Sequence, residues 1–325
     1  MRIFVKSEAG AAVAWVIMSL LLAATITPWL YRAGMGFAGM AAAQDLPAIL
    51  ETLGRACMRA QLSRYFNRAL LIAALVLLPF LLWRLRRVNS GSARGLLNLR
   101  WLRGREMLVQ LLTGGFIAGG ILWCLVLFLA AFGVFVATGE SLPFGKLLRE
   151  ILIPTVAAPL VEEFIFRGLL LGLWLRSAST LTACVGTSFV FAFLHFLAPP
   201  AGYAIADPRA ATAGFQLLGV IVFHFTDLRF FVTDFATLFV VGLILAWARV
   251  RTGSLWFSIG LHAGWVFAFK MASISYDSGP GHFLQPWGVG ANVRSGLLPM
   301  LSLGLTAAAC YLAMRWFEAT RRPSL

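Results

Sequence analysis

The sequence predicts an all-α membrane protein, built as a polytopic helical bundle of about eight transmembrane helices. Of the 325 residues, 60% are hydrophobic and only 12% are charged, and the mean hydropathy is +0.84. Apolar runs of about 20 residues recur along the chain, and each is long enough to cross a hydrocarbon core about 30 Å thick as a helix. An integral, multi-pass membrane protein is therefore expected.

The net charge of +14 indicates contact with lipid rather than with nucleic acid. In an integral membrane protein, an excess of Lys and Arg is typical of cytoplasmic loops and of segments that bind anionic headgroups. We therefore predict anionic lipids at the basic loops and no nucleic-acid partner. The four cysteines show no C-x-x-C spacing, so neither a disulfide framework nor a zinc knuckle is expected.

Residues 1–106 are expected to form an N-terminal transmembrane and interfacial region with a basic cytoplasmic loop. A first span over 11–31 is longer than the roughly 7 to 15 residues of a signal-peptide core, so we expect it to remain uncleaved. Residues 35–68 alternate apolar residues with arginines at helical spacing, which predicts an amphipathic interfacial helix. A second span over 69–83 ends in the densest basic block of the chain, at 84–105, which is expected in the cytoplasm.

The central region, residues 107–272, is expected to hold five spans. They are placed at 107–138, at 147–175, at 181–197, in a run that ends at 247, and at 255–269. The first of these exceeds the length that a bilayer needs, which predicts a tilt, a break or an extramembrane end. Residues 201–231 contain an apolar run that is too short to cross a membrane, so a lid or a re-entrant segment is expected there.

Residues 273–325 are expected to form a polar loop, a last transmembrane helix and a basic tail. Eight crossings place both termini on the same side of the membrane. Basic residues at both ends of the chain and at the turns near Arg176 and Arg249 place that side in the cytoplasm. This pattern favours a protein of the bacterial inner membrane.

Three charged residues interrupt the apolar run in the middle of the span at 147–175, namely Glu162, Glu163 and Arg167. A charge at the bilayer centre costs at least about 2.5 kcal/mol, and such residues usually face a bundle interior or a wet cavity. Because an α-helix turns by about 100° per residue, Glu163 and Arg167 share a face and are expected to pair. Glu162 is then left to point elsewhere, where it can reach a cavity. The alternative is an ion pair that only locks two helices together.

Two histidines, His195 and His262, lie inside two other predicted spans. A carboxylate and an imidazole that converge on one water can deprotonate it for attack on a peptide carbonyl, while a further donor stabilises the oxyanion. We therefore predict that Glu162 and the two histidines form a shared site for hydrolysis. A divalent metal such as zinc, bound by the same three residues, is the alternative. Because the chain has no H-E-x-x-H motif, the version that requires no cofactor needs fewer assumptions.

The order of these residues along the chain resembles the CPBP family, the CAAX-protease and bacteriocin-processing (Abi-like) intramembrane proteases. The motifs that carry the resemblance are Glu162-Glu163-x-x-x-Arg167, Phe191-x-x-x-His195 and His262-Ala263-x-x-Val266. The resemblance covers residues 147–270. It implies an intramembrane endopeptidase that acts on a membrane-associated protein or peptide.

The resemblance also implies a role for each residue of the first two motifs. Glu162 and His195 would activate the attacking water. Glu163 and Arg167 would support them. Phe191 would pack beside His195 on one face of its helix.

The third motif departs from the family pattern. The resemblance implies that His262 contributes to the oxyanion site, together with an Asn or Asp four residues later. That position is Val266, which can neither donate a hydrogen bond nor bind a metal. Loss of one oxyanion donor typically costs about 100- to 1000-fold in turnover. We expect a weakened but functional site, and the alternative is a catalytically weak or inactive membrane scaffold or binding protein that uses the same polar cavity.

Overall fold

The structure is a computed structural model, which describes residues 8–44, 46–88, 99, 100, 102, 104–139, 142–176, 178–197, 199, 200, 203–279, 284, 287–290 and 292–321. Parts of four predicted segments lie outside the described residues. They are 89–98, 101 and 103 of the basic block, 201 and 202 of the lid or re-entrant segment, 280–283, 285, 286 and 291 of the polar loop, and 322–325 of the basic tail.

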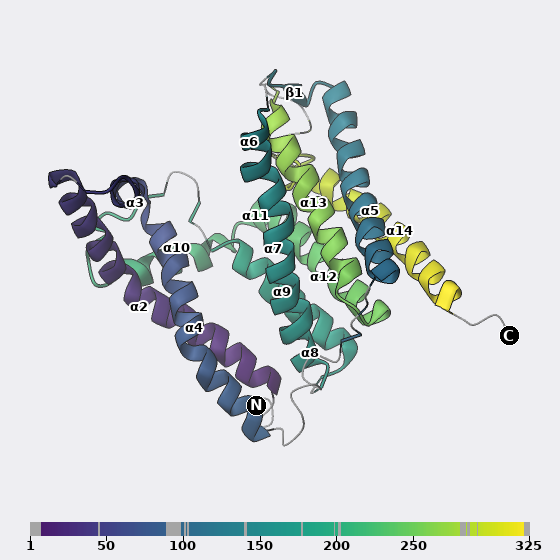
Figure 1. Cartoon of the computed structure of the whole chain (residues 1–325), viewed down its shortest axis with the longest axis horizontal. Helices are drawn as coiled ribbons and strands as arrows, with labels where there is room; N and C mark the ends of the chain where they lie inside the picture. The colour runs from purple at the N-terminus through teal and green to yellow at the C-terminus, as the bar shows by residue number, and fades with distance from the viewer. Residues whose placement is uncertain are drawn as a thin grey trace. The chain divides into compact units, whose positions relative to one another are not determined.

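The described secondary structure is helical apart from one two-stranded sheet, which confirms the predicted all-α class (Figure 1). Within the described residues, six helical runs are long and apolar enough to cross a membrane. They are α2 (Glu8–Ala43), α4 (Leu62–Val88), α5 (Gly104–Ala131), the continuous run of α11 (Leu228–Phe230), η4 (Phe231–Phe235) and α12 (Ala236–Thr252), α13 (Trp256–Ser275) and α14 (Leu297–Arg321).

The two other predicted spans are also helical but differ from these six. The span at 147–175 is one unbroken helical run of α6 (Phe144–Leu147), η2 (Leu148–Leu152), α7 (Ile153–Glu163), η3 (Phe164–Leu170) and α8 (Leu171–Trp174), in which η denotes π-helix. This run is long enough to span a membrane, but Glu162, Glu163 and Arg167 lie in its interior. The span at 181–197 is the shorter apolar helix α9 (Thr180–His195). By length and composition, six of the described helical runs could cross a membrane, so the number of about eight spans stays a prediction.

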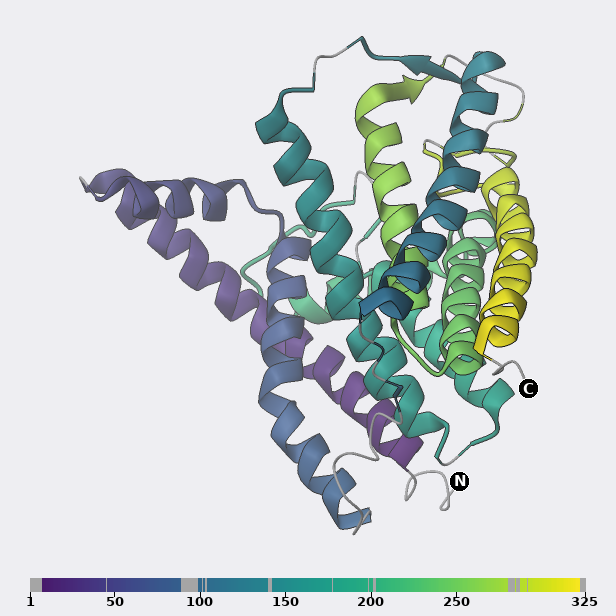
Figure 2. The same cartoon turned by 45° about the vertical axis from the view of Figure 1, so that its right-hand side comes forward.

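The chain divides into two compact units, Met1–Gly91 with Leu194–Asp227, and Ser92–Phe193 with Leu228–Leu325. In the first unit, α2 and α4 lie side by side and α3 (Ala48–Arg59) joins them (Figures 1 and 2). The predicted amphipathic helix within 35–68 corresponds to α3, whose exposed side chains include both Leu53 and Arg55. The division of the sequence at residues 106 and 272 stays a prediction.

The predicted lid or re-entrant segment contains α10 (Ala213–His224), a helix too short to cross a membrane. It packs on α2 at Gly214, where a Cβ atom would lie 1.9 Å from the carbonyl oxygen of Ala24. The residues before α10 are also tied to α2, because Arg32 Nε donates to the carbonyl oxygen of Arg209 at 2.9 Å. The function of this segment as a lid stays a prediction.

Close packing of α5 against α13 organises the second unit, where the two helices lie side by side (Figure 2). A Cβ atom at Gly260 would lie 2.1 Å from the carbonyl oxygen of Leu111, and one at Gly264 would lie 2.4 Å from that of Gly115. Small residues let the backbones of membrane helices approach closely in this way. The two glycines therefore fix the position of His262, which lies between them on α13.

A short hairpin-like sheet joins the same two helices at one end. Strand β1 (Phe135–Ala137) follows α5 and pairs antiparallel with β2 (Tyr276–Ser278), which follows α13; Val136 lies opposite Asp277. The excess length of the predicted span at 107–138 is thereby explained, because the helix ends at Ala131 and the chain then turns into β1.

Candidate active site

Helix α7 and segment η3 bury two charged residues and expose several apolar ones. Glu163 and Arg167 are 0% and 1% exposed, whereas Val156 and Val161 are both 58% exposed. This is the reverse of a helix in a soluble protein, and it is expected when lipid surrounds the bundle. Glu162 and Glu163 are the last residues of α7, and Arg167 lies in η3. Short π-helical segments inside α-helices frequently occur at functional sites.

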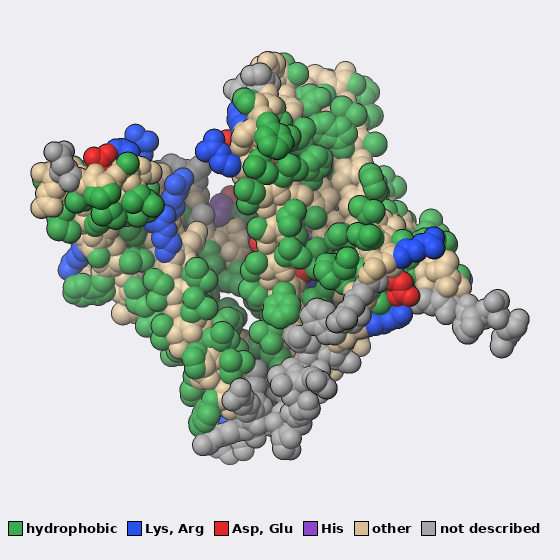
Figure 3. All heavy atoms as spheres, in the orientation of Figure 1, with side chains coloured by type: hydrophobic (Ala, Val, Ile, Leu, Met, Phe, Trp, Pro, Cys, Tyr) green, Lys and Arg blue, Asp and Glu red, His purple; other side chains and the backbone are tan. Residues whose placement is uncertain are grey.

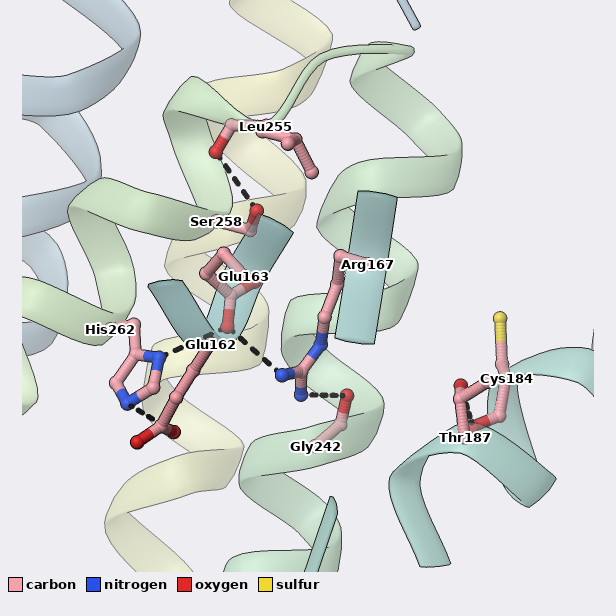
Figure 4. A network of polar contacts seen from close by, with 9 residues as sticks. All are labelled: Glu162, Glu163, Arg167, Cys184, Thr187, Gly242, Leu255, Ser258 and His262. Atoms are coloured by element: carbon pink, nitrogen blue, oxygen red, sulfur yellow. Dashed lines mark hydrogen bonds and ion pairs between the residues drawn. The ribbon is translucent and has the colours of Figure 1, made fainter. Parts of the chain in front are cut away.

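Glu163 is the centre of a buried network that links α7, η3, α12 and α13 (Figure 4). Its Oε1 atom accepts a hydrogen bond from Arg167 Nη1 at 2.9 Å and lies 3.0 Å from His262 Nδ1. Arg167 Nη2 donates to the carbonyl oxygen of Gly242 on α12 at 3.3 Å. A buried ion pair is tolerated only when further hydrogen bonds compensate its desolvation, and Gly242 and His262 supply them here. The pair predicted from helical spacing is therefore present.

The sequence analysis suggested that Glu162 points away from Glu163 and Arg167, but in the structure its side chain lies beside their network. Its Oε2 atom lies 3.8 Å from Nε2 of His262, and its side chain is 29% exposed. The angular offset between the two glutamates is present, but the imidazole lies between the two directions, so each carboxylate faces one of its ring nitrogens (Figure 4). The 3.8 Å separation is too long for a hydrogen bond and suits a charge interaction or a bridging water.

The hydrogen bonds of Glu163 determine which ring nitrogen of His262 carries a proton. An ionised carboxylate beside Arg167 can only accept, so the proton of the Glu163–His262 bond belongs to Nδ1. Nε2 is then an acceptor when the ring is neutral and a donor when the ring is protonated. A water that contacts both Glu162 Oε2 and His262 Nε2 could consequently bridge the two groups.

Phe191 forms the apolar wall of the network. It is fully buried on α9, and its ring stands edge-on to His262 with the ring centroids 5.9 Å apart. The guanidinium carbon of Arg167 lies 4.2 Å from the centroid of the same ring, within the range of a cation–π interaction. Phe191 thus restricts both the cation and the imidazole.

His195 is the last residue of α9, one turn after Phe191, and its side chain is exposed. It belongs to the first compact unit, whereas Glu162 and His262 belong to the second. The structure therefore brings Glu162, Glu163, Arg167, Phe191 and His262 together, and the pairing of His195 with Glu162 stays a prediction.

Gly242 is a site residue that the sequence analysis missed. Its carbonyl oxygen binds Arg167, and a Cβ atom at this position would lie 2.9 Å from the Cβ of Ser188 on α9. The signal that could have revealed it is a glycine in the interior of an apolar span, which often indicates close approach of a second helix.

A metal ion would find only part of a ligand set in the second unit. Glu162 Oε2 and His262 Nε2 face each other and are both ligand atoms for zinc, but Glu163 Oε1 already binds Arg167 and His262. Over the residues that the structure describes, no three His, Cys, Asp or Glu side chains cluster in a way that could hold a metal. A third ligand would have to come from elsewhere, and His195 is the residue that the sequence proposes.

The fold and this network define a multi-pass helical membrane protein with a buried Glu–Arg–His site. Residues 144–268 match the family model described as type II CAAX prenyl endopeptidase Rce1-like. The matched segment is similar to the CPBP (Abi) family, the family that the motifs resemble, and this similarity supports a CAAX-type intramembrane protease at the level of the family. No curated protein and no solved structure matches the chain.

Proposed function

We propose that this chain is an intramembrane endopeptidase that hydrolyses a peptide bond of a membrane-associated protein or peptide, using a water activated by Glu162 and a histidine. The observation that supports it is the 3.8 Å gap between Glu162 Oε2 and His262 Nε2, at the only part of the described network where a carboxylate is partly exposed. A water in this gap could contact both groups while a substrate approaches from the exposed side of Glu162.

In this proposal Glu162 is the general base. Together with His195, as the family resemblance implies, it accepts a proton from the water, which then attacks the carbonyl carbon of the scissile bond. Glu162 returns that proton to the leaving amine, so that one carboxylate acts first as base and then as acid.

His262 stabilises the oxyanion in its protonated form. Nδ1–H is held by Glu163, so a proton on Nε2 is directed toward the gap beside Glu162. Arg167 Nη1 binds the same oxygen of Glu163, so this carboxylate holds the Nδ1 side of the ring in place. A charged donor at this position partly compensates for Val266, which cannot donate.

The second candidate function is a noncatalytic membrane scaffold or binding protein, and Val266 is the observation that favours it. A chain without the usual oxyanion donor could bind a lipidated or anchored peptide at the same site without cleaving it. A cleavage assay distinguishes the two functions, because an enzyme hydrolyses the bound peptide and a scaffold releases it intact.

The test is cleavage of a panel of peptides by the purified full-length chain in phospholipid vesicles. The panel contains lipidated C-terminal peptides and unmodified membrane-anchored peptides. Glu162→Gln should lower turnover by at least about 100-fold, the usual effect of losing a general base. Glu150→Gln is the matched control, since Glu150 is exposed on the same helical run, and it should cleave like the wild type.

Unchanged cleavage by Glu162→Gln would exclude the proposed mechanism. Binding of a peptide without hydrolysis, by both the wild type and Glu162→Gln, would favour the scaffold. The metal alternative is tested in the same assay: loss of cleavage in a chelator and its return with zinc would assign the activation of water to a metal.

We also propose that both termini face the cytoplasm of a bacterium and that the protein resides in the inner membrane. The basic residues at the ends of the described spans support this orientation. Reporter fusions at residues 1 and 325 that both indicate the periplasm would contradict it.

A further inference from the structure

An apolar groove runs along the second compact unit between α5, α7 and α13, with a volume of about 660 Å³. Its lining is apolar or aromatic apart from the hydroxyl of Thr155, and glycines of α5 and α13 leave its floor open. Hydrophobic side chains also cover the visible surface over α5 and α7 (Figure 3). The groove is large enough for a small ligand, but its lining offers almost nothing to bind a polar one.

The groove adjoins two further cavities, and both are lined by arginine. The first, of about 120 Å³, shares Leu160, Trp256 and Ile259 with the groove and adds Arg100. The second shares Arg100 with the first and adds Arg249. The three cavities, linked by these shared lining residues, are called here the α5–α13 path, and their lining changes from apolar to basic.

The turn between α12 and α13 holds the two arginines at the basic end. Gly253 has a φ of +68°, in the left-handed region that favours glycine. Its N–H donates to the carbonyl of Arg249 at 3.0 Å, and its carbonyl accepts from the N–H of Arg100 at 2.7 Å. Trp256 Nε1 donates to the carbonyl of Leu102 at 3.2 Å, which further fixes the segment that carries Arg100. Arg249 is 4% exposed, so this end of the path is built into the unit.

We propose that the α5–α13 path binds one anionic phospholipid of the surrounding bilayer. Its phosphate lies at Arg100 and Arg249, and one acyl chain lies in the groove. Guanidinium groups bind phosphate through strong, often bidentate, charge-assisted hydrogen bonds. Basic pockets between transmembrane helices bind anionic headgroups for the same reason. The proposal does not depend on hydrolysis, because neither Glu162 nor His262 lines any of the three cavities.

One acidic residue competes with the lipid at this position. Arg100 Nη2 lies 3.2 Å from Glu106 Oε2, and both side chains are about half exposed. Exposed ion pairs are weak, so a phosphate can replace the carboxylate as the partner of Arg100. Arg251 provides a matched control on the same helix as Arg249, because it pairs with Glu318 at 2.7 Å and lines none of the three cavities.

The headgroup is tested by native mass spectrometry of the purified full-length chain in detergent, titrated with dioleoylphosphatidylglycerol or dioleoylphosphatidylcholine. We expect one phosphatidylglycerol to bind about tenfold more tightly than phosphatidylcholine. Arg249→Gln should remove this preference, Glu106→Gln should increase it, and Arg251→Gln should leave it unchanged. If Arg249→Gln does not fold, Arg100→Gln is used in its place and should also remove the preference. This variant should fold, because the side chain of Arg100 is half exposed.

The acyl chain is tested by filling the groove. A Cβ atom at Gly120 would meet nothing within 4 Å, so Gly120→Leu should occupy the groove without disturbing the helices and should weaken phosphatidylglycerol binding about tenfold. Gly36→Leu, at an equally open position on α2, should bind the lipid like the wild type.

Three results would overturn the proposal. The first is equal binding of the two lipids to the wild type, and the second is a preference that survives both Arg249→Gln and Arg100→Gln. The third is displacement of the bound lipid by a lipidated peptide at a ratio of one to one, because the path would then belong to the substrate. Tight phosphatidylglycerol binding by Gly120→Leu would likewise exclude the acyl-chain part.

Discussion

Nδ1 of His262 lies 3.0 Å from Oε1 of Glu163, although the two residues are 99 positions apart in the sequence. The same carboxylate oxygen accepts a hydrogen bond from Arg167. Glu163 thereby connects a buried cation to an imidazole whose other nitrogen faces the partly exposed Glu162. Because these groups form one network, a change at Glu163 or Arg167 should affect both the stability of the fold and the position of His262 beside Glu162.

Replacing Glu163 by Ala should reduce the free energy of unfolding by about 3–5 kcal/mol, because Arg167 would be left as an uncompensated buried charge. The change can be measured by titrating the detergent-solubilised chain with a denaturing detergent. Glu51→Ala is the control, since Glu51 forms the same i, i+4 ion pair with Arg55 on the surface of α3. It should cost no more than about 1 kcal/mol. Equal losses for the two variants would show that burial does not set the strength of the pair.

The spacing of charges was sufficient to predict the Glu163–Arg167 pair, because the contact lies within one turn of helix and depends on no other element. The direction of Glu162 could not be predicted in the same way. It depends on where α13 places His262, and this is set by the contacts of Gly260 and Gly264 with α5. Local periodicity contains no information about such a contact.

The helical class and most span limits followed from apolar runs, because lipid requires every backbone polar group to be paired within a helix. The π-helical segments η2, η3 and η4 were not predicted, since they arise from packing and not from composition. Gly242 was also missed, because its function depends on its backbone carbonyl and on the absence of a side chain beside Ser188.

Replacing Gly264 by Ala should destabilise the second unit by about 1–3 kcal/mol, the usual cost of overpacking a close contact. The new Cβ atom would lie 2.4 Å from the backbone oxygen of Gly115, so one of the two helices must move. Gly36→Ala is the control, because its Cβ atom would meet nothing within 4 Å. It should be neutral or slightly stabilising, since Ala favours a helix by up to about 1 kcal/mol over Gly. A neutral Gly264→Ala would contradict the close packing of α5 and α13.

Replacing Phe191 by Leu should cost about 1–3 kcal/mol, because it removes the ring beneath Arg167 and leaves part of its volume unfilled. Phe189→Leu on the same helix should cost less, since the ring of Phe189 is 50% exposed. The unfolding titration described above measures both. Equal losses would contradict this expectation, because the burial of Phe191 and its contact with the Arg167 cation both predict the larger loss at Phe191.

Replacing Val266 by Asn should raise turnover by about tenfold or more, because removing a single oxyanion donor from an enzyme typically costs about 100- to 1000-fold in turnover. Val266 lies one turn after His262 on α13, so an amide at this position would face the same side of the helix. The gain should appear in kcat rather than in KM, since an oxyanion exists only in the transition state and the tetrahedral intermediate. Val266→Leu, which adds no donor, should cleave like the wild type.

A folded Val266→Asn variant with unchanged kcat would mean that the oxyanion is already fully stabilised by His262 or by groups elsewhere in the chain. If the wild type bound the peptide without cleaving it and the Val266→Asn variant cleaved it, the natural chain would instead be a scaffold that lacks one oxyanion donor.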